Sequence, residues 1–498
     1  MKRREFFGSS LGMVAASALP AGPAQPAQEG ARKFPNVPGL TKYVCEFIVN
    51  TKYQDIPEEV LALGRKSILD GFGLALAGSV SPMGPLIRQY VEKFAAPGAR
   101  ASVIGTGMKV PTRFAALANG TFIHADDFDD TQLSVAPDRV YGLLTHPTVP
   151  VLPPVFALAE TNHYTGQELT LAYHVGVEVE CKIAEAISPR HYGDGFHSTG
   201  TMGSFGSAAA CAKLLKLDVK RTANALGIAG GEAGGLRSNF GSMTKPFTAG
   251  HAAENGVVAA DLASIGWTAS EEILEAKEGW FSAAGGGFDP EAIMNRLGKP
   301  WTFANPGVSI KPFPSGSLTH PAMGEMLRLA REHNIQPTNV EKVDMGGNSA
   351  MMAALIHHRP ENSLQAKFSM EFCMAILLLD RRAGLTEFTD PVVRRADVQQ
   401  LLRRVNFYVD PEAEKAGLNK MTSIIKIHMK DGKEISGRAE FAKGHPLNPM
   451  TYEDEADKFR GCAEFAKWPS AKTDSVIQIV RTLDKSPDVT RISSALTS

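Results

Sequence analysis

Long helical stretches rich in small side chains, between about residues 38 and 270, constrain the fold of this chain most strongly. In one of them Val60, Gly64, Ile68 and Phe72 recur every four residues, which is the spacing of a single helix face. Alanine and glycine are abundant in the others, and such small side chains let neighbouring helices approach closely. The first half therefore predicts a tightly packed helical domain, with further helices at residues 147–160, 169–187, 203–215 and 251–265.

Both chain ends carry helix signals. The run Asp55–Glu58 predicts a helix start in which Asp55 is the capping residue and Pro57 lies in the first turn. Near the other end, residues 454–468 and 475–483 return to helical spacing. We expect this C-terminal part to pack back onto the first domain.

The pattern changes after about Pro306, where short β-type runs replace the long helices. Two of these runs flank Asp431-Gly432, the dipeptide type that most strongly indicates a two-residue hairpin turn. Helical spacing returns between the runs, at residues 363–379 and 397–404. This part predicts an α+β domain with strands at residues 340–345, 405–409, 423–430 and 433–438.

Charge and cysteine content narrow the function. The 498 residues include 52 Lys and Arg against 53 Asp and Glu, so no overall basic field attracts nucleic acid. No stretch of the sequence is long and apolar enough to predict a membrane span. The five cysteines are widely spaced and form no C-x-x-C pair, so we interpret them as buried thiols.

The N-terminus predicts export. Arg3-Arg4 is followed by a short apolar run from Gly8 to Leu19 and by residues rich in Pro and Ala. These are the charged, apolar and small-residue regions of a twin-arginine signal, which we assign to residues 1–30, and they predict a periplasmic protein. A disordered tail that happens to contain Arg-Arg is the alternative.

Three of five segments that combine polar residues with glycine or proline offer an acid or a base. His124–Thr131 holds four aspartates in five positions, which fits a solvated helix end, a metal-binding cluster without fixed ligand spacing, or a catalytic group. His146 precedes Pro147 at a helix entrance, and His197 leads into a Gly/Ala-rich helix. Each histidine could exchange a proton near neutral pH, although a lone histidine is more often structural.

The other two segments supply cations. Lys245 lies in a Gly/Ser-rich stretch just before a helix, where an anion could bind, and Arg237 opens the same stretch. Lys311 lies at the junction of the two expected domains, and clefts between domains favour small ligands. The sequence contains no P-loop, dinucleotide fingerprint, H-E-x-x-H motif or G-x-S-x-G elbow, so we do not expect a nucleotide, flavin or zinc enzyme.

Taken in order, these segments resemble the MmgE/PrpD family over about residues 38 to 485. The likeness rests on D-F-D-D-T at Asp127–Thr131, H-P at His146, G-F-H-x-T-G around His197, T-K-P-F around Lys245, K-P-F-P at Lys311, A-K-F-S at Ala366–Ser369 and G-H-P-L-N-P at Gly444–Pro449. The resemblance implies a mainly α fold and a homodimer. A large all-α helical domain would be formed by both chain ends (residues 35–306 and 446–490), with a smaller α+β lid domain inserted at 307–445.

The resemblance also implies a site between the helical domain and the lid that requires no metal and no organic cofactor. Removing a proton next to a carboxylate places negative charge on that carboxylate, which Lys245 and Lys311 could stabilise. Asp127 could orient a histidine or bind a substrate hydroxyl, and Arg237 could bind an additional carboxylate. One histidine could take the proton while the other protonates a departing hydroxyl. The positions that match the family's catalytic and substrate-binding residues are Asp127, Thr131, His146, His197, Lys245 and Lys311.

Three departures from the family pattern leave the substrate open. Gly316 stands where decarboxylase relatives carry a histidine, and Gln132 stands where many relatives carry another. The stretch from Thr131 to His146 is also longer, and its additional residues include Asp138, Arg139 and Tyr141. These differences make decarboxylation of cis-aconitate a weaker expectation.

The function we expect is that of a cofactor-independent lyase that dehydrates a small hydroxylated di- or tricarboxylate by α-proton abstraction. An epimerase that removes and returns the α-proton would use the same residues, and decarboxylation also stays open. A periplasmic carboxylate-binding protein without catalysis is a different class of function. Such a binder would not need both histidines and both lysines.

Overall fold

Helices dominate the part of the chain that the computed structural model describes, which is residues 34–132, 135–136, 139–140, 142–417 and 420–498. The mainly α fold class predicted above is therefore confirmed. The predicted export signal lies outside the described residues. Residues 35–498 form one compact unit, so the domain boundaries at 306/307 and 445/446 stay a prediction.

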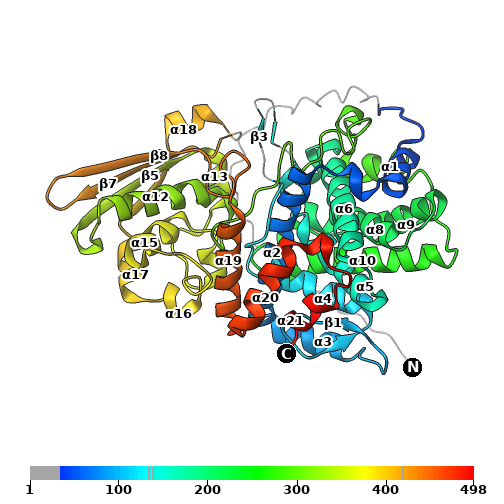
Figure 1. The fold of residues 1–498 in the computed structure, drawn as a ribbon. Helices are drawn as coiled ribbons and strands as arrows, with labels where there is room; N and C mark the ends of the chain where they lie inside the picture. Colours follow the sequence, from blue (N-terminus) through cyan, green and yellow to red (C-terminus); the bar gives the residue numbers. More distant parts are fainter. Residues whose placement is uncertain (1–33, 133–134, 137–138, 141, 418–419) are drawn as a thin grey trace, which may run out of the picture. The chain divides into compact units, whose positions relative to one another are not determined.

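The helical region contains the first eleven α-helices and the last three, together with two short antiparallel strand pairs (Figure 1). The strand pairs are β1 (Ala101–Ser102) with β2 (Lys109–Val110) and β3 (Val135–Ala136) with β4 (Arg139–Val140). The helices are α1 (Leu40–Asn50), α2 (Glu58–Ser79), α3 (Gly84–Glu92), α4 (Thr112–His124), α5 (Thr148–Asn162), α6 (Gly166–Ala186), α7 (Arg190–Gly193), α8 (Ser198–Leu214), α9 (Val219–Glu232), α10 (Thr244–Ser264), α11 (Trp280–Gly285), α19 (Tyr452–Phe465), α20 (Ser470–Arg481) and α21 (Thr490–Leu496).

Small residues allow close helix packing, as the sequence predicted. A side chain at Gly120 of α4 would begin 2.8 Å from the Cα of Gly250 in α10. At Gly73 of α2 it would begin 2.9 Å from the ring of Phe459 in α19. Because a Cβ does not fit at these distances, glycine is needed at both crossings. The second crossing also confirms that the C-terminal helices pack onto the N-terminal ones, where α19 lies beside α2 (Figure 1).

The start of α2 differs from the prediction. The helix begins at Glu58 with Pro57 as its N-cap, and no side chain caps it. Asp55 instead ends a short 3₁₀ turn, where its carboxylate accepts the backbone N–H of Lys52 at 2.7 Å. An aspartate can cap whichever nearby turn presents N–H groups, so local sequence did not decide between the two turns.

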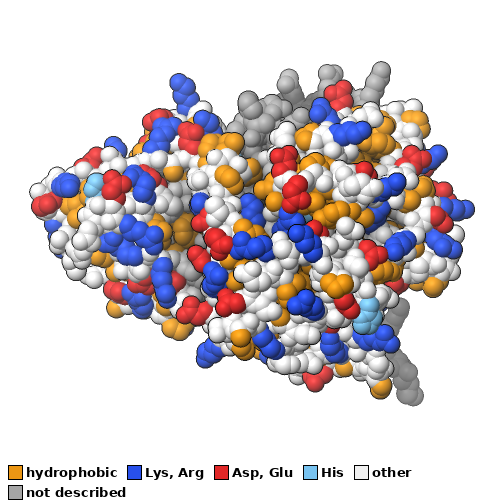
Figure 2. Space-filling view, viewed as in Figure 1, with side chains coloured by type: hydrophobic (Ala, Val, Ile, Leu, Met, Phe, Trp, Pro, Cys, Tyr) orange, Lys and Arg blue, Asp and Glu red, His pale blue; other side chains and the backbone are white. Residues whose placement is uncertain are grey.

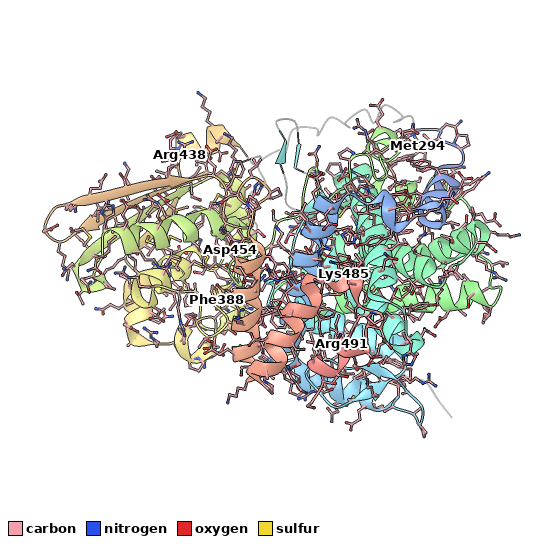
Figure 3. The ribbon with its side chains drawn as sticks, in the orientation of Figure 1. Met294, Phe388, Arg438, Asp454, Lys485 and Arg491 are labelled. Carbon is pink, nitrogen blue, oxygen red and sulfur yellow. The ribbon has the colours of Figure 1, made fainter. Side chains whose placement is uncertain are left out.

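The sheet region, which we define as residues 317–439, has a four-stranded sheet with the order β6-β5-β7-β8. Strands β5 and β6 are parallel and the other neighbours are antiparallel. Helices α12 and α15 contact each other and the sheet, and they enclose a core that includes Phe388 (Figure 3). Its elements are α12 (His320–Glu332), β5 (Val340–Gly347), α13 (Ser349–Ala354), α14 (Ser363–Ala366), α15 (Met370–Asp380), α16 (Asp390–Val393), α17 (Ala396–Leu402), β6 (Val405–Val409), α18 (Pro411–Ala416), β7 (Ser423–Met429) and β8 (Glu434–Ala439).

The strand predictions are confirmed and one helix prediction is not. Asp431-Gly432 forms the predicted turn between β7 and β8, and Gly432 adopts φ +86°. Residues 363–379 form two helices instead of one, because the Ser369 hydroxyl accepts the backbone N–H of Phe372 and starts α15 anew. Lys367, in the break, is thereby free to extend toward the helical region.

No helix among the described residues is long and apolar enough to cross a bilayer. On the face shown in Figure 2, basic and acidic side chains are interspersed. All five cysteines are buried and free, as predicted.

Candidate active site

The seven predicted site residues line one pocket, whose volume is about 360 Å³. The helical region supplies one side of the pocket and the sheet region supplies the other. Sequence positions as far apart as 127 and 311 therefore meet in a single cavity. The seven residues are Asp127, Thr131, His146, His197, Arg237, Lys245 and Lys311.

The acidic run after α4 is buried and forms one side of this pocket. Asp127 is 8% exposed, and Asp129 and Asp130 are each 1% exposed. The reading of this run as a solvated helix end is therefore wrong. Asp127 adopts φ +51°, a conformation that non-glycine residues rarely hold unless their surroundings fix it. We call residues 126–131 the acid loop.

Two lysines fix the Asp127 carboxylate. The Nζ of Lys245 donates to Asp127 Oδ1 at 2.6 Å, and the Nζ of Lys311 lies 3.1 Å from the same oxygen. Burial alone would raise the pKa of Asp127, but the two ammonium groups outweigh it and hold this pKa far below its usual range. Asp127 is therefore ionised, and its strongest contacts are to lysines, with His146 Nε2 farther away at 4.0 Å.

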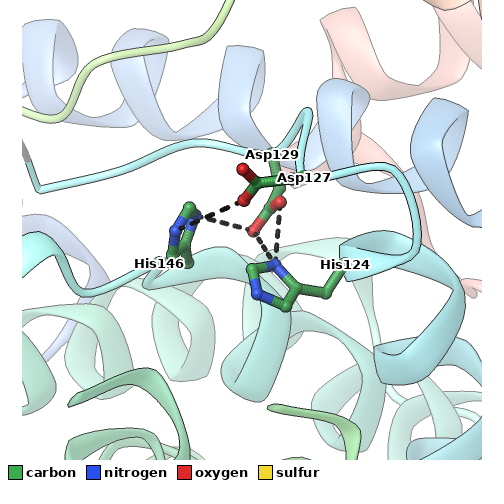
Figure 4. A group of neighbouring side chains, drawn as sticks. All are labelled: His124, Asp127, Asp129 and His146. Atoms are coloured by element: carbon green, nitrogen blue, oxygen red, sulfur yellow. Dashed lines mark hydrogen bonds and ion pairs between the residues drawn. The ribbon is translucent and has the colours of Figure 1, made fainter. Parts of the chain in front are cut away.

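Asp129 is the carboxylate that orients the histidines (Figure 4). It lies 2.9 Å from His124 Nδ1 and 3.0 Å from His146 Nδ1. His146 Nδ1 also lies 2.8 Å from the carbonyl oxygen of Asp130, which can only accept, so this nitrogen carries a proton. His146 consequently exposes Nε2 to the pocket, with a carboxylate behind its ring.

His197 is held in the neutral form that leaves its pocket-side nitrogen bare. Its Nδ1 lies 2.8 Å from the Thr248 hydroxyl, which donates its own proton to the carbonyl of Lys245. His197 Nδ1 is therefore the donor, and Nε2, which is buried without a partner, keeps its lone pair. Burial and the neighbouring cations lower the pKa of His197 well below its usual value.

Three lysines from separate parts of the chain bind three consecutive carbonyls of the acid loop. Lys367 donates to the carbonyl of Asp126 at 2.7 Å, Lys311 to that of Asp127 at 2.8 Å and Lys458 to that of Phe128 at 2.8 Å. Each ammonium also meets a carboxylate, as Lys458 does with Asp70 at 2.6 Å. This set of bonds fixes the backbone on which Asp127 and Asp129 are mounted.

Backbone hydrogen bonds position Thr131 and Arg237 at the pocket. Thr131 and Ser309 exchange two backbone hydrogen bonds of 2.8 Å, which brings the segment of Lys311 beside the acid loop. Arg237 donates its backbone N–H to Gly195 at 2.8 Å, and its guanidinium lies 4.0 Å from the centre of the Tyr192 ring. The Nη1 of Arg237 donates to the carbonyl oxygen of Tyr192 at 2.9 Å, whereas its Nε is buried without a hydrogen-bond partner.

The acid loop could also be considered as a metal site. Ligand atoms of His124, Asp127, Asp129 and His146 lie within 4.8 Å of one another. A cation there would meet the ammonium groups that already hold Asp127, and it would compete with both imidazoles for Asp129. These four side chains are therefore better suited to share protons among themselves than to bind a metal ion.

The sequence missed several residues that the structure brings to the site. Lys367 lies within the quoted A-K-F-S motif, which could have drawn attention to it, whereas nothing in the sequence singled out Lys458. The pocket is also lined by apolar residues, of which Phe368 lies in the same A-K-F-S motif. We call the following set the apolar lining: Leu144, Phe240, Leu318, Leu355, Ile356 and Phe368.

The three departures from the family pattern have different outcomes. Gly316 lines the pocket. Gln132 is fully buried and its amide donates to Glu185 at 2.7 Å, so its side chain serves the interior instead of the pocket. Asp138 and Tyr141 lie outside the described residues.

Comparison with known proteins agrees with the family resemblance seen in the sequence. The MmgE/PrpD N-terminal domain matches residues 42–293, and the MmgE/PrpD C-terminal domain matches residues 313–485. Cis-aconitate decarboxylase of Homo sapiens is 27% identical over 468 residues, covering 92% of this chain and 94% of that protein. Cis-aconitate decarboxylase of Aspergillus terreus is 30% identical over 482 residues, covering 91% and 94%. This chain belongs to the MmgE/PrpD family.

Proposed function

We propose that this protein is a cofactor-independent lyase that acts on a small carboxylate by moving a proton at the carbon next to that carboxylate. The leading reaction is dehydration of a hydroxylated di- or tricarboxylate. One observation carries the proposal: two imidazoles, two lysines and an arginine converge on one pocket. The similarity to cis-aconitate decarboxylases, which are lyases, supports the same class.

His146 is suited to take the proton. Its Nε2 is the nitrogen that meets the pocket, and Asp129 on its Nδ1 side would stabilise the imidazolium that forms. An aspartate behind a histidine base has the same role in serine hydrolases. Arg237, Lys245 and Lys311 would hold the substrate's carboxylates, including the one on which negative charge grows as the proton leaves.

We propose that His197 orients the substrate and does not protonate a departing hydroxyl. Its Nδ1 proton is committed to Thr248, so its bare Nε2 cannot donate to a departing hydroxyl. It can instead accept a hydrogen bond from the substrate hydroxyl and orient it. Burial lowers the pKa of Lys311, so its ammonium is a better proton donor to the leaving hydroxyl than the neutral His197.

Decarboxylation is the second candidate, because the relatives named above carry that activity. Loss of carbon dioxide leaves the same carbanion next to a carboxylate, and His146 would then deliver a proton instead of taking one. Gly316 lines the pocket where decarboxylase relatives carry a histidine, and this departure favours dehydration.

Proton NMR of the purified protein in heavy water tests the proposal on a panel of hydroxy- and amino-polycarboxylates, with Lys245→Ala as the control. Loss of the α-proton signal together with new vinyl signals would support dehydration. Carbon dioxide released in a parallel gas assay would support decarboxylation, and a second diastereomer in the spectrum would support an epimerase. Ligand line-broadening without exchange on any acid would instead support a binding protein and overturn the proposed lyase.

We also propose that the protein is exported through the twin-arginine route and acts as a homodimer. Arg3-Arg4 and the apolar run after it support export, and the family resemblance supports the dimer. Light scattering of the purified protein gives the dimer's mass directly, and a monomer mass at assay concentration would contradict it.

A further inference from the structure

The pocket carries a limited amount of fixed charge. Its lining includes three cationic side chains, Arg237, Lys245 and Lys311, and one anionic side chain, Asp127. Between residues 317 and 439, the part of the lining that the structure describes has no side chain with a fixed charge, and its polar members are Ser317 and His357. A net charge of about +2 fits two substrate carboxylates better than three.

The apolar lining covers the part of the pocket that the sheet region forms. Leu318, Leu355, Ile356 and Phe368 all come from that region, and Phe240 reaches the same cavity from the helical region. Ile356 is 61% exposed although it lines the pocket, so a large apolar side chain faces solvent at the site. A ligand that covered it would remove apolar surface from water.

Gly316 extends this apolar surface. A Cβ built on Gly316 would lie 3.4 Å from the ring of Phe368, which is ordinary van der Waals contact. The carbonyl oxygen of Lys367 lies 3.6 Å from the same Cβ, so the space beside Gly316 is bordered by an aromatic ring and a hydrogen-bond acceptor, neither of which attracts a carboxylate. A third carboxylate placed against this surface would lose hydration without gaining a cation, which is costly.

The cavity has room for more than a small dicarboxylate. Its volume of about 360 Å³ equals the space of about 12 waters at roughly 30 Å³ each. A four-carbon hydroxy-dicarboxylate occupies less than this, so space remains next to the apolar lining.

From these observations we infer that the substrate is a small dicarboxylate bearing an apolar substituent, an alkyl or aryl group that packs against Leu318, Leu355, Ile356 and Phe368. This inference rests on the proposed function, because it assigns the two carboxylates to Arg237, Lys245 and Lys311. It differs from the tricarboxylate named for the relatives.

Calorimetric titration of the full chain with three unreactive acids tests the inference without requiring catalysis. The acids are succinate, 2-propylsuccinate and propane-1,2,3-tricarboxylate. We expect 2-propylsuccinate to bind about tenfold or more tightly than succinate, since burying each methylene contributes several-fold. We also expect it to bind more tightly than the tricarboxylate.

Ile356→Ser removes part of the apolar lining at an exposed position where folding does not depend on it. It should reduce the ratio of propylsuccinate to succinate affinity several-fold. Ile265→Ser is the matched control, because Ile265 is 81% exposed and lies outside the pocket lining, and it should leave that ratio unchanged.

Tighter binding of the tricarboxylate than of propylsuccinate, equal binding of succinate and propylsuccinate, or no binding of any of the three acids would overturn the inference. Failure of the proposed function has a separate signature. In that case the alkyl acid binds as expected, but none of the reactive acids exchanges its α-proton.

Discussion

The two sides of the pocket are built in opposite ways. The acid loop and its lysines are buried charges, each held by several bonds, so that Asp127 has two ammonium partners and its backbone carbonyl a third bond. Apart from the buried Leu355, the apolar lining consists of half-buried or exposed side chains such as Phe368 and Ile356. In the proposed function the charged side carries the chemistry, so we expect substitutions there to cost both activity and stability, and substitutions at the exposed apolar positions to cost little stability.

Substitution of His146 should have the largest effect on activity. His146→Ala removes the proposed base and should lower kcat by about 10²- to 10⁴-fold. His197→Ala should act more on KM, because His197 orients the substrate in our proposal. Steady-state kinetics on the substrate identified by NMR measures both, with the exposed His163→Ala as control. Equal kcat for His146→Ala and the unmodified protein would remove the proposed base from the mechanism.

Substitution of Lys458 tests whether the geometry of the acid loop depends on residues outside the pocket. Lys458→Met leaves Asp70 as an unpaired buried carboxylate and frees the carbonyl of Phe128, so we expect a loss of about 3–5 kcal/mol in stability. Activity should fall about tenfold in kcat with little change in KM, because the loop that carries Asp127 and Asp129 loses one of its bonds. The Asp70→Asn/Lys458→Met double variant should recover part of the stability and none of the kcat.

Lys342→Met is the matched control for that experiment, since Lys342 forms an exposed ion pair with Asp344 at 2.8 Å. Such exposed pairs contribute about 1 kcal/mol or less. A Lys458→Met protein as stable and active as Lys342→Met would show that the acid loop keeps its geometry without this bond.

Asp130 should make the stability of the protein depend on pH. Burial raises the pKa of Asp130 from 3.8 to about 7, so the folded protein favours the protonated carboxyl. Because the folded-state pKa lies above the unfolded one, the protonated Asp130 carboxyl contributes fully to the free energy of unfolding below pH 4. This contribution, up to about 4 kcal/mol, is lost as the pH rises to about 7. The melting temperature of Asp130→Asn should therefore fall less between pH 5 and pH 8 than that of the unmodified protein. The same pH dependence in Asp130→Asn as in Asp474→Asn, an exposed control, would contradict this assignment.

Substitution of Arg3-Arg4 by Lys-Lys should have the smallest effect on the pocket. We expect the purified variant to keep its activity and its melting temperature while the protein stays in the cytoplasm of an expressing cell. Fractionation followed by immunoblotting measures this. Periplasmic accumulation of the Lys-Lys variant would rule out the twin-arginine route.

Much of the fold could be predicted because its signals are local. The spacing of Val60, Gly64, Ile68 and Phe72 predicted α2, and all four residues are buried. Asp431-Gly432 predicted the β7–β8 turn because few other dipeptides adopt that geometry. The failures came where two local patterns compete: Asp55 could cap either of two turns, and Ser369 restarts a helix within an unbroken apolar pattern.

By itself, the sequence determined which side chains can carry chemistry. Five site residues were recognisable from motifs, because clusters of polar residues beside glycine or proline can be read directly from the sequence. They are Asp127, His146, His197, Lys245 and Lys311. Only the tertiary structure decided their partners and their protonation. Asp129, not Asp127, orients the imidazoles, His197 is neutral, and Lys367 and Lys458 bind the acid loop across 241 and 330 residues of chain. The physical reason is that pKa values and hydrogen bonds depend on burial and on charges within a few ångströms, and these distances exist only after distant segments have packed together.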